Sequence, residues 1–78
     1  MARIIVVRTN QSKKDGSIEE IDAAIVVQDD SNEIIVHGEE PVIRNSVEKF
    51  ISQGHSLDEV LQKFNRPPYV WSVEMEDN

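Results

Sequence analysis

The sequence contains no cysteine, and this absence excludes several kinds of site at once. Without thiols the chain has no disulfide framework, no thiolate nucleophile and no sulfur ligand for zinc. Stability must then come from apolar packing or from a partner. The longest N-terminal apolar run, Ile4 to Val7, is far too short to span a bilayer, and no extended apolar segment of a secretory signal is present. We expect a cytoplasmic protein with no membrane partner.

The sequence is also poor in motifs that carry chemistry. Its three glycines are isolated, so no glycine-rich phosphate loop is present, and no GxSxG turn supplies a nucleophile. His37 and His55 lie on different predicted elements, without the spacing of a zinc motif. A chain of this size rarely encloses a substrate pocket. We therefore predict a non-enzymatic protein with no catalytic residues, no cofactor and no metal site.

One segment partly matches the pattern of a calcium-binding loop. If Asp29 is the first loop position, Ser31 and Glu33 fall at the third and fifth, and Glu40 falls at the twelfth, where a bidentate glutamate belongs. The sixth position needs glycine for a sharp turn but is Ile34. The β-branched residues that follow favour a strand, so a hairpin is the better interpretation.

Charge is distributed unevenly along this chain, whose formal net charge is −7. Basic residues open the sequence, whereas no lysine or arginine lies between Asp15 and Glu40. Such an acidic block repels phosphate backbones and favours basic surfaces, although acidity also simply keeps a small domain soluble. The candidate partner-binding residues are the carboxylates of this block: Glu19, Glu20, Asp22, Asp29, Asp30, Glu33, Glu39 and Glu40.

Three strands are predicted in the first half of the chain. The β-branched run Ile4 to Val7 predicts a strand over Arg3–Thr9, and Asp15-Gly16 predicts a chain reversal. Residues 17–28 are ambiguous, because Ser17 to Glu20 has the form of a helix capping box while Ile25-Val26-Val27 favours a strand. We predict a strand here, joined by a hairpin to a third strand over Glu33–His37.

Two helices are predicted next. Asn45 is a good N-cap for a helix over Ser46–Gln53, although a start at Pro41 is also allowed. Gly54 suits the left-handed conformation that ends a helix, and Ser56 can cap a second helix. This second helix carries the clearest apolar stripe of the chain, formed by Leu57, Val60, Leu61 and Phe64. His55, between the helices, is expected near helix carbonyls or in solvent.

A last strand is predicted over Tyr69–Met75, with Tyr69 and Trp71 facing inward. The whole pattern predicts an α+β fold in which residues 1–78 form a single domain. A three-stranded N-terminal meander and the C-terminal strand would form a small antiparallel sheet, with two short helices packed on one face. The last strand, if exposed at the sheet edge, can pair with a second copy of the chain.

The helical pair can also be interpreted as a helix-turn-helix. Its second helix would place Asp58 and Glu59 toward DNA phosphates, which is unfavourable. Pro41-Val42-Ile43-Arg44 and the later segment from Gly54 to Leu61 resemble two elements of a family of small helix-turn-helix antitoxins. The likeness covers less than a third of the chain, and Asn45-Ser46 stands where that family tends to have Gly-Thr.

These observations favour a small acidic protein-binding module that acts on a basic surface, which could belong to a nucleic-acid-binding protein. Inhibitors, antitoxins and phage-encoded anti-defence proteins fit this description. A helix-turn-helix regulator that uses residues 46–64 is the first alternative. An accessory subunit with no link to nucleic acid is the second.

Overall fold

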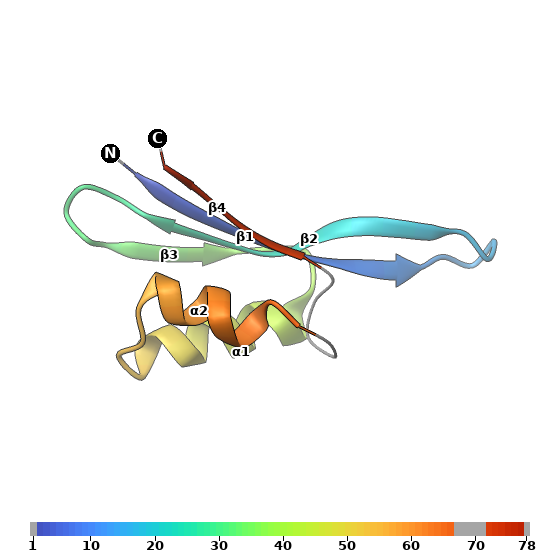
Figure 1. Cartoon of the computed structure of the whole chain (residues 1–78). Coiled ribbons are helices and arrows are strands. Elements are labelled where there is room, and N and C mark those ends of the chain that lie inside the picture. The colour runs from blue at the N-terminus through green and yellow to red at the C-terminus, as the bar shows by residue number, and fades with distance from the viewer. Residues whose placement is uncertain (1, 67–71, 78) are drawn as a thin grey trace.

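A computed structural model describes residues 2–66 and 72–77. It shows a four-stranded antiparallel sheet with two helices, the predicted α+β fold (Figure 1). In chain order the elements are β1 (Arg3–Ser12), β2 (Ile18–Gln28), β3 (Ile34–His37), α1 (Pro41–Ser52), α2 (Leu57–Phe64) and β4 (Ser72–Asp77). The strand order in the sheet is β3-β2-β1-β4, so the first and last strands lie side by side.

Strands β1 and β2 form one long hairpin with a break in register. Val7 pairs with Ala24 but Arg8 pairs with Asp22, so Ala23 is the extra residue of a β-bulge on β2. Beyond the bulge the two strands continue to Ser12 and Ile18. This distal part of the hairpin, residues 9–20, projects past the rest of the molecule (Figure 1). We call it the arm.

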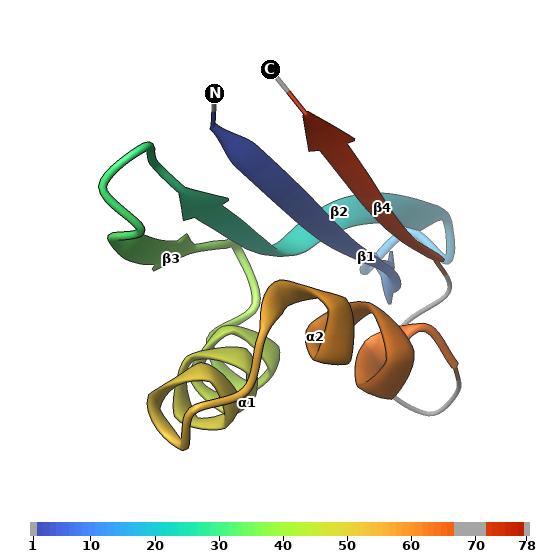
Figure 2. The same ribbon diagram turned by 60° about the vertical axis from the view of Figure 1, so that its left-hand side comes forward.

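Both helices lie on the same face of the sheet, as predicted (Figure 2). The core forms between the two layers and contains Phe64, one of the largest fully buried side chains. Phe64 and its α2 neighbours pack onto alternate residues of β1 and β2, because side chains on one face of a strand are two residues apart. The buried cluster consists of Ile5, Val7, Ala24, Val26, Val47, Leu57, Val60 and Phe64.

The first helix begins earlier than the preferred prediction. Asn45 does not cap it; the N-cap is Glu40, whose carboxylate accepts a hydrogen bond from the backbone N–H of Ile43 at 3.0 Å. The alternative start at Pro41 is confirmed. Proline suits the first turn because its missing N–H has no helical partner there.

The second helix follows its sequence signals closely. Ser56 and Glu59 form a reciprocal capping box, and Gly54 adopts a φ of 95° between the helices, as expected. Residues 18–28 form a strand, so the capping-box interpretation of Ser17 to Glu20 is wrong. Reversals occur at Lys13–Gly16 and Asp29–Asn32, as the turn residues predicted.

Two strand ends differ from the predictions by more than one residue. Strand β1 runs to Ser12 rather than Thr9, because the arm continues the pairing with polar residues. Strand β4 runs to Asp77 rather than Met75, and its predicted beginning, Tyr69 to Trp71, lies outside the described residues. In the part of the chain that the structure describes, neither helix is long and apolar enough to cross a bilayer.

Candidate protein-binding face

One face of the sheet is covered by the helices, and none of the other elements that the structure describes covers the opposite face (Figures 1 and 2). Ile5 and Val7 of β1 face the helices, so their neighbours Ile4 and Val6 face the opposite side. The strand register places further β-branched residues beside them, because Ile4 pairs with Val27, Val27 with Ile35, and Val6 with Ile25. We call this surface the open face; its apolar residues are Ile4, Val6, Ile25, Val27 and Ile35.

The apolar residues of the open face partly cover one another. Val6, near the middle, is only 8% exposed, whereas Ile35 on the edge strand β3 is 48% exposed. Ile4, Ile25 and Val27 are half-buried. A half-exposed row of branched side chains is costly to leave in water, and contiguous surfaces of this kind mark interaction sites.

Carboxylates border the open face. Glu20 and Asp22 precede Ile25 along β2 on the same side, and Glu76 pairs with Ile4 across β1 and β4. Asp22 is engaged in an ion pair with Arg8 at 3.2 Å, and Arg8 is the cation on this side of β1. The border therefore carries more negative than positive groups, and His37 is the exposed ring at the β3 end.

The structure separates the eight predicted partner-binding carboxylates into three groups. The arm and its base carry Glu19, Glu20 and Asp22, whereas the β2–β3 turn, at the other end of the sheet, carries Asp29, Asp30 and Glu33 (Figure 1). Glu39 and Glu40 lie in the connection to α1. No single patch contains all eight residues.

Several of these carboxylates have local structural roles. Glu40 caps α1, and Glu19 lies 3.4 Å from Lys13 in an ion pair. Asp29 accepts hydrogen bonds from the Ser31 hydroxyl at 2.7 Å, the Ser31 N–H at 3.0 Å and the Glu33 N–H at 2.9 Å. The Ser31 hydroxyl, followed by the Glu33 and Ser31 backbone N–H groups, lowers the pKa of Asp29 below its ordinary value of 3.8. Asp29 thus builds the turn that the calcium-loop pattern had suggested as a ligand site.

The helical pair serves as a covering layer. Leu57, Val60 and Phe64, on one side of α2, are buried against the sheet. The first turn of α2 carries Asp58 and Glu59, and Glu59 is engaged with His55 and the Ser56 N–H. A DNA-recognition helix places its N-terminal end close to DNA phosphates. The carboxylates at this end of α2 would repel those phosphates. The geometry does not favour the helix-turn-helix alternative.

Histidine and carboxylate groups are dispersed over the part of the molecule that the structure describes. Among these residues, no cluster of three or more possible metal ligands occurs. His55 stacks on Phe50, with ring centroids 3.9 Å apart, and its Nδ1 lies 2.8 Å from a Glu59 carboxylate oxygen. His55 therefore contacts Phe50 and Glu59, while 37% of its side chain stays exposed.

Comparison with known proteins gives no family for this chain. No family model, no curated protein and no solved structure matches it. The resemblance to helix-turn-helix antitoxins stays a prediction from two short elements.

The open face could have been found from the sequence only in part. Ile4-Ile5-Val6-Val7 signals a strand that is apolar on both sides, and such a strand requires cover on both faces. Two helices on one side cover only one of them. What the sequence did not show is which residues of β2 and β3 lie beside Ile4 and Val6, because the bulge at Ala23 sets that register.

Proposed function

We propose that this chain is a non-enzymatic protein-binding module whose open face binds a partner protein. The observation that carries the proposal is the uncovered side of the sheet, where five β-branched residues lie together. Interfaces between proteins commonly have an apolar centre and a polar border, and the open face has both. An inhibitor, an antitoxin or an anti-defence protein would use such a surface.

Charge complementarity supports a basic partner. Glu20, Asp22 and Glu76 border the open face in a chain with a net charge of −7. A partner whose apolar patch is edged by lysines and arginines would be attracted at long range and would fit at contact. Two copies of this chain would instead repel each other at long range, because both are acidic. This repulsion disfavours self-association through the open face.

The proposal is tested by affinity capture from cell extract with matched variants. Ile35→Ser removes an apolar side chain that is 48% exposed, so it should leave the fold intact. Val42→Ser is the control, because Val42 is 72% exposed on α1, on the other side of the molecule. We expect a basic protein that the parent and Val42→Ser retain and that Ile35→Ser loses.

The role of the carboxylates that border the open face is tested with the partner protein identified by this capture. Replacing Glu20 and Glu76 with lysine should slow association strongly at low salt and less at physiological salt, where the Debye length is about 8 Å. Circular dichroism of each variant checks the fold. Retention by Ile35→Ser equal to that by the parent, with the same association rate for the lysine variant, would remove the open face from consideration.

A further inference from the structure

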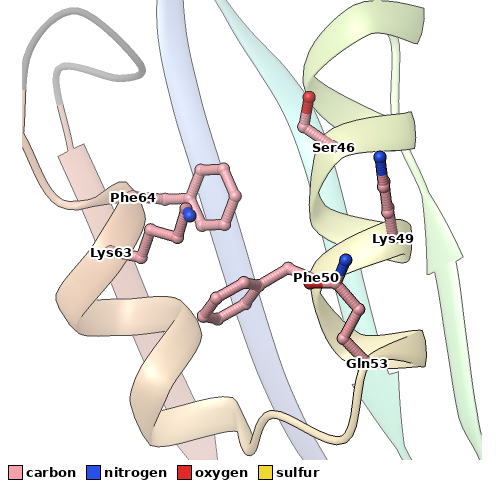
Figure 3. Close-up of a pocket in the computed structure, with 6 residues that line it drawn as sticks. All are labelled: Ser46, Lys49, Phe50, Gln53, Lys63 and Phe64. Carbon is pink, nitrogen blue, oxygen red and sulfur yellow. The ribbon is translucent and has the colours of Figure 1, made fainter.

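A second surface of the molecule has the opposite charge. A groove of about 300 Å³ lies between α1 and α2, on the side away from the sheet (Figure 3). Helix α1 contributes Ser46, Lys49, Phe50 and Gln53, and α2 contributes Lys63 and Phe64. Among the residues that the structure describes, no acidic side chain lines the groove, although the chain has fifteen Asp and Glu residues against eight Lys and Arg.

The two lysines of the groove make no ion pair with any carboxylate that the structure describes. Three of the other basic side chains are neutralised locally, because Arg3, Arg8 and Lys13 pair with Asp58, Asp22 and Glu19 at 3.2 to 3.4 Å. Two carboxylates lie near the groove but outside its lining. Glu48 lines a separate hollow on α1 that Lys49 also borders, and Glu59, which borders a hollow beside Lys63, is held by His55 and the Ser56 N–H.

Lys63 is held in place by a chain of contacts. Its ammonium group lies 4.8 Å from the centroid of the Phe50 ring, a distance at which a cation is attracted by the aromatic face. Phe50 is itself fixed, since His55 stacks on it at 3.9 Å and Phe64 meets it edge-on at 5.8 Å. Glu59 then holds His55 at 2.8 Å. This arrangement lowers the entropy lost when Lys63 binds a ligand.

The donors of the groove select the kind of ligand. The Ser46 hydroxyl already donates to the Val42 carbonyl at 2.8 Å, which leaves Lys49, Lys63 and the Gln53 amide to face a ligand. Phe50 has one face covered by His55 and the ammonium of Lys63 over its ring, so it is not free to stack on a base or an aromatic ligand. The groove therefore suits a compact, highly charged anion.

A phosphate monoester fits this chemistry better than a carboxylate. It carries a charge of roughly −1.5 to −2 at neutral pH and offers three oxygens, so one group can accept hydrogen bonds from more than one donor. Lysine binds phosphate as a point charge, whereas paired recognition of a planar carboxylate favours arginine, which does not line the groove. We propose that the α1–α2 groove is a binding site for a phosphate monoester group, held by Lys49 and Lys63.

The test is a titration of the whole chain with inorganic phosphate, followed by the amide spectra of isotopically labelled protein. Chloride at equal ionic strength serves as the blank. We expect saturable shifts confined to residues of α1 and α2 around the groove. Shifts that rise without saturation, or that appear equally with chloride, would overturn the proposal.

Charge-matched variants separate the site from a general effect of charge. Lys49→Gln and Lys63→Gln should each weaken phosphate binding about tenfold, as loss of one charge-assisted hydrogen bond predicts. Lys14→Gln removes an exposed lysine at the tip of the arm, far from the groove, and should leave binding unchanged. Equal weakening by Lys14→Gln, or none by Lys63→Gln, would contradict the proposal.

A last comparison identifies the source of the phosphate group and keeps this site distinct from the open face. A phosphoserine peptide that binds much more tightly than inorganic phosphate would indicate a phosphorylated protein, whereas equal affinity would indicate a small phosphorylated molecule. Ile35→Ser, on the opposite side of the sheet, should bind phosphate like the parent. Loss of phosphate binding in this variant would contradict the assignment to the groove.

Discussion

Gly38 is the residue that lets the chain leave β3 and turn toward α1. Its φ is 146°, and a Cβ there would overlap the backbone of Ala23, at the bulge of β2. The connection is tight because the N–H groups of Glu39 and Glu40 donate to the carbonyls of Asp22 and Ala23 at 3.0 and 3.3 Å. Gly38 therefore fixes where α1 can begin.

Gly38→Ala should lower the free energy of unfolding by about 2 to 5 kcal/mol, the combined cost of a positive φ and of overpacking against backbone. Gly54→Ala is the matched control, because Gly54 also has a positive φ but faces open space. Its expected cost is only about 1 to 2 kcal/mol. Urea unfolding of both variants measures the difference. Equal costs would show that the approach to Ala23 is relieved by a small backbone shift.

Asp29 gives the β2–β3 turn a dependence on pH. Hydrogen bonds from Ser31 and Glu33 hold its pKa below 3.8 in the folded chain, so the unfolded chain binds the proton more readily. The stabilisation is therefore fully present above about pH 5 and is lost as the pH falls below 3.8 and through the lowered pKa. Asp29→Asn keeps an acceptor oxygen but removes the titration.

The free energy of unfolding of the parent should exceed that of Asp29→Asn at about pH 6, and the difference should shrink as the pH falls below 3.8. Urea unfolding at several pH values measures it, and other carboxylates titrate alike in both proteins. A gap that does not change with pH would mean that the charge of Asp29 is unimportant to the turn.

At the scale of elements, local sequence signals predicted a helix or strand correctly where they agreed with one another. They failed where two signals in the same segment favoured different boundaries or different structures. Ser56 and Glu59 pointed to one cap, and α2 begins there. Asn45 was the stronger capping residue, yet α1 begins at Pro41 because the N–H groups of Glu39 and Glu40 tie the preceding connection to β2. The Ser17 to Glu20 pattern suits a helix, but pairing with β1 overrides it. Tertiary contacts determined the structure in the last two cases. Such contacts cannot be deduced from the spacing of apolar residues along the sequence.

The candidate sites were less predictable than the elements. That both helices cover one face was expected, but the residues of the open face depend on the bulge at Ala23. The α1–α2 groove depends on Phe50 and His55 meeting across the inter-helix turn. The acidic residues of the block from Asp15 to Glu40 are close in sequence, but the length of β2 separates those of the arm from those of the β2–β3 turn.

The arm should be the least stable part of the sheet. Residues 10–20 are all exposed, whereas Ile5, Val7 and Val26 are fully buried in the shared core. Backbone hydrogen bonds without apolar cover open locally at little cost. In a hydrogen-exchange experiment, strand amides of the arm should exchange faster than those of Val7 and Val26 by orders of magnitude. Similar protection in both regions would mean that the hairpin opens as one unit.

For the whole molecule, the −7 net charge should limit stability at low salt. The Debye length is about 30 Å at 0.01 M salt and about 10 Å at 0.1 M, and the longest dimension of the molecule is 44 Å. At 0.01 M salt, carboxylates that lie far apart in the molecule therefore repel one another. At 0.1 M salt, the repulsion acts mainly between neighbouring carboxylates. We expect the melting temperature to rise by several degrees as sodium chloride increases over this range.

A neutralised variant tests the cause of that salt effect. Replacing four carboxylates by glutamine takes the net charge from −7 to −3. Suitable positions are exposed and lie outside the helix caps and the ion pairs described above; they are Glu20, Glu33, Glu39 and Glu48. This variant should melt higher than the parent at 0.01 M salt and respond less to added salt, because fewer like charges remain to be screened. If salt instead lowers the melting temperature of both proteins, the ion pairs of Arg3, Arg8 and Lys13 outweigh the repulsion. The acidic excess would then cost the fold little, and a purely solubilising role would explain it without a basic partner.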